Sequence, residues 1–245
     1  MAGPYRLQVG PAGGIVRVLL ACTGVVSLLI GVWGFLYLRG HEFVMVIPDP
    51  ARPGRQDPYW VGSTFPMYLW IPSLVSQATI VLWLIWQHQA TANLWARGFQ
   101  GLRIRPGWAV GWWFIPFANL AMPLVAMLEL DRRSTPDGQP RKASPLLGWW
   151  WAAWLASSTL PAIGMVGSMF SAMLDLVRSV DNNTRSVDFT AVAHAIAPWL
   201  VLSGVLQATA AALAFLVVRR IDRSQEQVVA AGSAAPARPD AGLAE

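Results

Sequence analysis

The chain has 245 residues, of which 55% are hydrophobic and 13% charged, and its mean hydropathy is +0.44. This composition excludes an ordinary soluble domain, which carries more charge, and indicates an integral membrane protein. The formal charge of +5 comes from basic residues that lie between apolar segments rather than in one stripe, so it does not indicate nucleic acid as a partner.

A helix that crosses the bilayer needs about 20 mostly apolar residues. Four stretches meet this requirement, at residues 15–38, 65–86, 146–174 and 191–218. The third and fourth contain Pro161 and Pro198, so we expect tilt or kinks in them. The membrane domain therefore covers residues 15–223. It follows a cytoplasmic N-terminus at 1–14 and precedes an Ala, Gly, Pro and Ser tail at 224–245 that we expect to be disordered.

A fifth apolar stretch, residues 108–128, is interrupted by Pro116 and Pro123 on either side of Asn119. Each proline removes a backbone donor and clashes with the preceding turn, so an ordinary spanning helix is not expected there. The stretch either crosses as a fifth span or enters and returns on one side as a re-entrant hairpin.

The distribution of basic residues favours the hairpin. With four crossings and a hairpin, twelve basic residues share the cytoplasmic face with both termini, and five lie opposite. The twelve are Arg6, Arg17, Arg97, Arg103, Arg105, Arg132, Arg133, Arg141, Lys142, Arg219, Arg220 and Arg223; the five are Arg39, Arg52, Arg55, Arg178 and Arg185. Eight tryptophans, at positions 86, 95, 108, 112, 113, 149, 150 and 151, would collect near the same interface. We therefore predict an all-α fold of four transmembrane helices plus a proline-broken re-entrant hairpin, with five transmembrane helices as the alternative.

The connection at residues 40–64 contains several prolines and mixed charges, which are incompatible with a helix, and is expected to be an external loop. Residues 175–188 form a shorter external loop.

The segment PGWAVGWWFIPFANLAMP at residues 106–123, the charged stretch at 129–134 and the aromatic cluster GWWWAAW at 148–154 resemble the membrane family of the domain of unknown function 4328. The resemblance extends from residue 65 to residue 220 and includes Asn93-x-x-x-Arg97 and Arg105-Pro-Gly-Trp108. It implies a multi-span bacterial membrane protein and no particular activity. The chain departs from the family pattern at Ala121 and Leu124, where larger residues are usual, and this puts the local packing in doubt.

Signatures of chemistry are absent from the sequence. No Asp, Glu or Lys lies in the middle of a predicted span, where ionisable residues usually mark transport paths. The three histidines have no nearby carboxylates to complete a metal site. No nucleophile motif accompanies the serines. We therefore expect no enzymatic activity, no metal and no cofactor.

The prolines at 116 and 123 free backbone carbonyls at membrane depth, where an unsatisfied polar group costs several kcal/mol. Asn119, which lies between them, carries two donors and an acceptor, so we expect its side chain to bond the hairpin backbone or the second span near Gln77. Asn119, Pro116, Pro123 and Gln77 are therefore the candidate binding residues, together with the basic Arg97 and Arg105.

Small residues repeat every fourth position at Gly204, Ala208 and Ala212, which lets another helix approach closely. Packing within the chain is the simpler interpretation, and a homodimer the alternative.

Two functions are consistent with these features. The first is a non-enzymatic scaffold or accessory protein of a bacterial plasma membrane, which binds lipid, including anionic lipid, or another membrane protein through its tryptophan-rich inner rim. The second is a small transporter or channel lined by residues 108–128.

Overall fold

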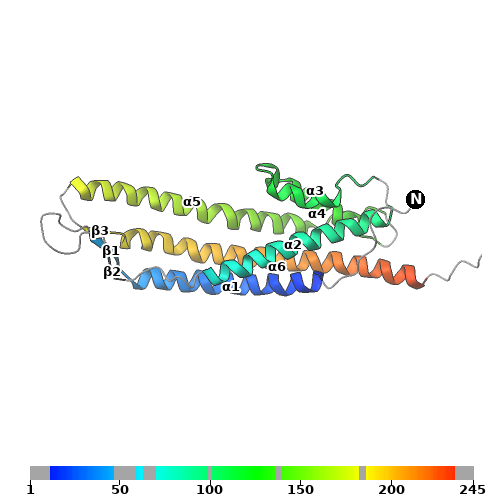
Figure 1. The fold of residues 1–245 in the computed structure, drawn as a ribbon, viewed down its shortest axis with the longest axis horizontal. Coiled ribbons are helices and arrows are strands. Elements are labelled where there is room, and N and C mark those ends of the chain that lie inside the picture. The colour runs from blue at the N-terminus through cyan, green and yellow to red at the C-terminus, as the bar shows by residue number, and fades with distance from the viewer. Residues whose placement is uncertain are drawn as a thin grey trace, which may run out of the picture. The chain divides into compact units, whose positions relative to one another are not determined.

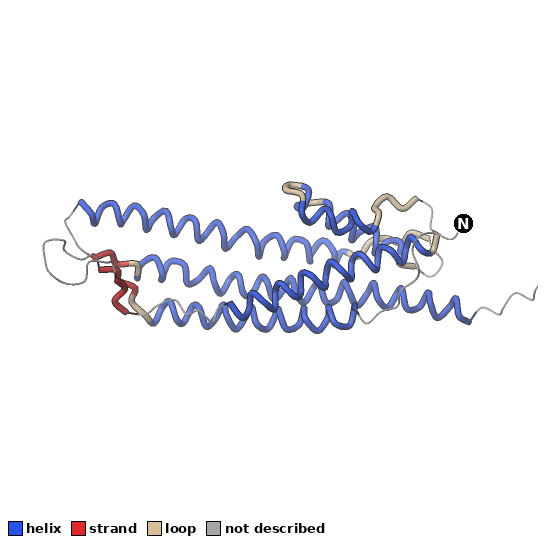
Figure 2. Tube along the Cα trace, in the orientation of Figure 1, coloured by secondary structure: helices blue, strands red, loops and turns tan. Residues whose placement is uncertain are grey.

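The computed structural model describes residues 12–46, 59–62, 70–98, 101–135, 139–181 and 186–234 (Figure 1). Within them, α-helices predominate and three short strands are present (Figure 2). The six α-helices are α1 (Ala12–Gly40), α2 (Trp70–Ala96), α3 (Pro106–Gly111), α4 (Met122–Arg133), α5 (Pro145–Asp181) and α6 (Thr190–Ala234), and the strands are β1 (Phe43–Val46), β2 (Tyr59–Gly62) and β3 (Ser186–Asp188).

Three of these helices are long and apolar enough to cross a membrane. They are α1, α5 over Pro145–Asp175 and α6 over Thr190–Gln227, and they contain the first, third and fourth predicted spans. Helices α5 and α6 continue through Pro161 and Pro198. The second predicted span corresponds to α2, which is a helix of 27 residues but is not among the three. The chain is thus a multi-pass membrane protein with three candidate spans.

The chain divides into two compact units. The first unit contains residues 1–19, 78–149 and 213–245, and the second contains residues 20–77 and 150–212. Four long helices contribute to both units. The described basic residues that were assigned to the cytoplasmic face by charge counting all belong to the first unit, whereas Arg39 and Arg178 belong to the second.

The second unit contains the three strands in the order β2-β1-β3, with β1 antiparallel to both neighbours. Phe43 pairs with Gly62, and Val44 with Asp188. The backbone N–H of Phe43 also donates to Thr190 Oγ1 at 3.0 Å, which joins β1 to the first residue of α6. The helical fold class is confirmed, but the two predicted external loops are not entirely irregular: the connection at 40–64 supplies β1 and β2, and the connection at 175–188 contains the end of α5 and β3. Residues 47–58 and 63–64 lie outside the described residues.

Close packing of α1 against α6 is also found in the second unit. A Cβ at Gly204 would lie 2.6 Å from the carbonyl oxygen of Ser27, and a Cβ at Gly31 would lie 2.7 Å from that of Leu200. Only glycine fits at such separations. The predicted role of the small-residue stripe in packing within the chain is therefore confirmed at Gly204. Ala208 also faces α1, where a Cβ at Gly24 would make an ordinary contact of 3.7 Å with it.

The first unit contains the proline-broken segment, which folds back on itself. Helix α3 is followed by two 3₁₀ turns, η2 (Trp112–Phe114) and η3 (Ala118–Leu120), and then by α4, which returns along α3. Ile104, Ala109 and Ala126 form the small core between the two arms. With six and twelve residues, neither arm is long enough to cross a bilayer.

Part of the predicted disordered tail, residues 224–234, is helical. Helix α6 continues to Ala234, where disorder was expected from residue 224. Ile221 and Ser224 are buried there, so the end of this helix gains packing that its composition does not reveal. Residues 1–11 and 235–245 lie outside the described part of the chain.

Candidate functional site

A polar cluster in the first unit surrounds Asp131, in the last turn of α4. Pro123, Met127 and Leu130 are buried on one side of this helix. Asp131 follows Met127 by four residues, so it lies on the same face and is fully buried as well. A buried carboxylate requires charged or hydrogen-bonding partners.

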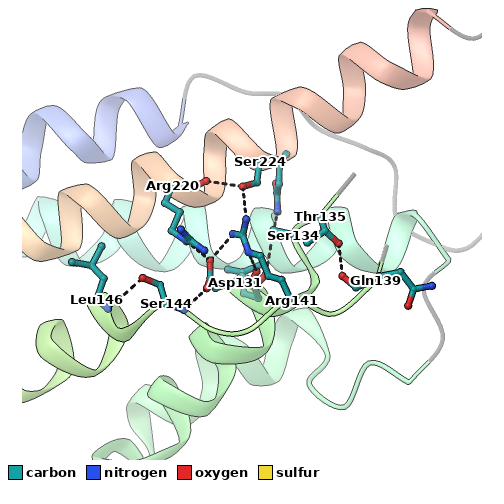
Figure 3. A network of polar contacts seen from close by, with 11 residues as sticks. Asp131, Ser134, Thr135, Gln139, Arg141, Ser144, Leu146, Arg220 and Ser224 are labelled. Atoms are coloured by element: carbon teal, nitrogen blue, oxygen red, sulfur yellow. Dashed lines mark hydrogen bonds and ion pairs between the residues drawn. The ribbon is translucent and has the colours of Figure 1, made fainter. Parts of the chain in front are cut away.

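Three groups supply those partners (Figure 3). Arg141 Nη2 and Arg220 Nε donate to Asp131 Oδ1 at 2.6 and 2.8 Å, and the Ser144 N–H donates to Oδ2 at 2.9 Å. Arg141 Nε also donates to the Asp131 carbonyl at 3.1 Å, and Arg141 Nη1 donates to Ser224 Oγ at 3.3 Å. Asp131 therefore connects α4, the segment that leads into α5, and α6.

The environment of Asp131 keeps it ionised. Burial alone would raise the pKa of the carboxyl group, but the hydrogen bonds from Arg220, Ser144 and Arg141 outweigh burial and hold the pKa below its ordinary value. A carboxyl group whose pKa is lowered from its ordinary value is ionised at neutral pH and therefore unsuited to donate a proton. The arrangement is suited to fixing three segments in place.

A second polar cluster joins α2 to α6. Asn93 Nδ2 donates to Gln225 Oε1 at 3.0 Å, and Gln225 Nε2 donates to the Ala90 carbonyl at 3.1 Å. One turn earlier on α6, Asp222 Oδ1 accepts a hydrogen bond of 2.9 Å from Trp86 Nε1. The end of α6 is therefore held against α2 by polar side chains rather than by apolar packing alone.

The base of the hairpin is closed by hydrogen bonds. The Arg103 N–H donates to Glu129 Oε1 at 2.6 Å, and Trp95 Nε1 donates to the Ile104 carbonyl at 3.0 Å. Trp113 Nε1 in η2 donates to Gln87 Oε1 at 2.9 Å, which attaches the upper part of the hairpin to α2.

The tip of the hairpin is apolar and open. The side chains of Phe114 and Phe117 are 71% and 85% exposed, and Ile115 and Leu120 are exposed as well. Phe117 has a φ of 64°, a conformation that is unfavourable for a residue with a Cβ. An aromatic side chain therefore lies at a position where glycine would be easier to accommodate.

Two predicted site residues share this tip. Pro116 is exposed, Asn119 is half-buried in η3, and the Asn119 N–H donates to the Ile115 carbonyl at 3.0 Å. Among the described residues the Asn119 side chain makes no hydrogen bond, so the expected one is not found there. Gln77 belongs to the second unit, where it is exposed.

Of the other predicted residues, Pro123 lies next to the tip, and Arg97 and Arg105 lie at the foot of the hairpin. Pro123 is buried in the first turn of α4, where its missing N–H costs nothing. Arg97 Nη2 donates to the Thr135 carbonyl at 2.8 Å. Arg105 is exposed and immediately precedes α3. The role of all six residues in binding stays a prediction.

Sequence reasoning overlooked Asp131 and its two arginines. A signal was present, because residues 123, 127, 130 and 131 lie on one face of a helix and the last of them is an aspartate. The described residues contain no group of three or more His, Cys, Asp or Glu side chains that could hold a metal ion.

The comparisons with known proteins give one positive result. The family model described as "Domain of unknown function (DUF4328)" matches residues 65–223, which is more than half of the chain. Among curated proteins and solved structures there is no match.

Proposed function

Because the chain belongs to the DUF4328 family and has three helices able to cross a membrane, we propose that it is a non-enzymatic accessory protein of a bacterial plasma membrane. It binds membrane lipid or another membrane protein through the hairpin and through the eight tryptophans predicted to lie near the same interface.

The observation that carries this proposal is the amphiphilic hairpin. Its tip exposes Phe114 and Phe117, whereas its base exposes Arg103, Arg105 and Arg132. Exposed phenylalanine side chains favour an apolar environment such as the bilayer, and arginines favour anionic head groups. The hairpin is therefore a re-entrant element: its arginine-bearing base stays at the membrane surface, and its apolar tip enters the bilayer from that side.

The rest of the topology follows from the same argument. Helix α2 is the fourth crossing, and both termini are cytoplasmic. The gathering of the described basic residues, apart from Arg39 and Arg178, in the first unit supports this orientation, because cytoplasmic segments carry an excess of lysine and arginine.

One observation favours a transporter or channel as the second candidate. Gln87 is fully buried beside the hairpin, and its Nε2 has no hydrogen-bond partner among the described residues. A buried amide of this kind commonly bonds water, and a hydrated position beside a broken helix is what a solute path requires.

Photo-cross-linking tests the proposal. A benzophenone amino acid replaces Phe117 in the full chain, and the same replacement at exposed Lys142 is the control. We expect position 117 to form adducts with phospholipid or with a second membrane protein in native membranes. Adducts within the chain only, together with solute flux in proteoliposomes, would replace the accessory role with transport.

A further inference from the structure

An open pocket of about 320 Å³ lies in the first unit, beside the base of the hairpin. Its walls come from the segment before α3, from α4 and from the segment that follows α4. The lining residues are Gly101, Arg103, Val125, Leu128, Glu129, Arg132, Arg133 and Pro140.

The pocket carries uncompensated positive charge. It is lined by three arginines, Arg103, Arg132 and Arg133, and by one carboxylate, Glu129. Oxygen Oε1 of Glu129 already accepts the Arg103 N–H at 2.6 Å. None of the three guanidinium groups forms an ion pair within the described part of the chain. Arg141 and Arg220 differ from them, since both bind Asp131.

At the edge of the pocket, the backbone of Gly101 lies close to the guanidinium group of Arg133. Gly101 has a φ of 79°, and a Cβ built there would lie 3.5 Å from Arg133 Nη2. The separation is an ordinary contact, so it is the positive φ, which strains other residues, that favours glycine at this turn.

The pocket is polar at one end and apolar at the other. Val125, Leu128, Glu129 and Arg132 follow one another at the spacing that places side chains on a single helix face. Val125 is exposed, so the apolar half of this stripe is available to a ligand. The stripe runs from the tip side of the hairpin to the arginines at its base.

We propose that this pocket binds the phosphate group of an anionic amphiphile. Guanidinium groups match the oxygens of a phosphate in paired hydrogen bonds, and three arginines line this one concave surface. An acyl or glycerol portion then lies along Leu128 and Val125 towards the hairpin tip. The inference deepens the proposed lipid binding and rests on it for the source of the ligand.

The test uses the full chain in a non-ionic detergent, with native mass spectrometry and titration of three probes. These are dioctanoyl phosphatidylglycerol, dioctanoyl phosphatidylcholine and glycerol phosphate. The test variant is Arg132→Gln with Arg133→Gln, and the matched control is Arg219→Gln with Arg223→Gln, which removes the same charge from α6. We expect the test variant to weaken phosphatidylglycerol binding at least about tenfold and the control to leave it unchanged.

The arms of the experiment separate the two sources of phosphate. The site is assigned to a membrane lipid if phosphatidylglycerol binds more strongly than glycerol phosphate and if Val125→Ser weakens the binding of the lipid only. Equal binding of both, lost in the same arginine variant, assigns it to a soluble phosphorylated anion.

Two outcomes would contradict the proposal that this pocket binds phosphate. One is the absence of saturable binding for all three probes, and the other is equal weakening by the test and control variants. Cross-linking of lipid from position 117 in either case would leave the accessory function standing without this site.

Discussion

Arg97 Nη2 donates a hydrogen bond of 2.8 Å to the carbonyl oxygen of Thr135, although 38 residues separate the two in the sequence. The segment between them contains the whole of the hairpin. Residues joined by a hydrogen bond lie at the same depth, whereas the two ends of a crossing are about 30 Å apart. The two ends of the hairpin segment therefore lie next to each other, as the proposed re-entrant topology requires.

This relationship predicts the outcome of cysteine labelling. In a Cys22→Ala background, we expect Arg105→Cys and Lys142→Cys to react with an impermeant maleimide from the cytoplasmic side, and Arg39→Cys from the outside. All three positions are exposed, so access is decided by the membrane. Labelling of residues 105 and 142 from opposite sides would restore the five-span alternative.

Removing the carboxylate at the centre of the polar cluster should destabilise the protein. Asp131→Asn leaves Arg141 and Arg220 without their anion. Their side chains are 29% and 39% exposed and can be rehydrated in part, so we expect a loss of about 2 kcal/mol rather than the larger cost of a fully buried pair. Thermal unfolding in detergent measures this loss.

The matched control for this variant is Asp175→Asn. Asp175 pairs with Arg178 at 3.1 Å, but both side chains are largely exposed. Exposed pairs contribute about 0 to 1 kcal/mol, so the control should melt with the wild type. Equal melting of all three proteins would mean that Asp131 does not hold the cluster together.

The pKa of Asp131 also predicts how its contribution depends on pH. Because the pKa is lowered in the folded protein from an ordinary value of 3.8, the stability that Asp131 contributes is fully present above that value. It is lost as the pH falls below 3.8 and through the folded pKa. The melting temperatures of wild type and Asp131→Asn should therefore differ by a constant amount from about pH 7 to 5 and converge in stronger acid. A difference that grows in acid would contradict this assignment.

The features that follow from local patterns were predicted from the sequence. Apolar runs located α1, α5 and α6, because a crossing helix needs length and apolarity and little else. The prolines at 116 and 123 located the break between α3 and α4, since neither can continue the turn before it. The count of basic residues on the two predicted faces of the membrane assigned to one face the same arginines that the first unit contains.

The features that were missed depend on distant partners. Strand β1 pairs with β3 some 140 residues later, and a register of this kind leaves no periodic signal in a loop with several prolines. Asp131 bonds Arg141 ten residues away and Arg220 89 residues away, so its role emerges only when α4 and α6 meet. The extension of α6 has the same cause, because Ser224 and Gln225 obtain their contacts from other segments.

The close approach of α1 and α6 gives the last prediction. A methyl group at position 204 would lie 2.6 Å from the Ser27 carbonyl oxygen and 3.3 Å from the Gly31 Cα, and both are backbone atoms that cannot rotate away. Gly204→Ala should therefore force the helices apart and lower the free energy of unfolding by about 1–3 kcal/mol. At Gly167 in α5 nothing lies within 4 Å of the added Cβ, so Gly167→Ala should leave the melting temperature unchanged or raise it slightly through better helix propensity. If the two alanine variants melt together, the contact between α1 and α6 is looser than these distances require.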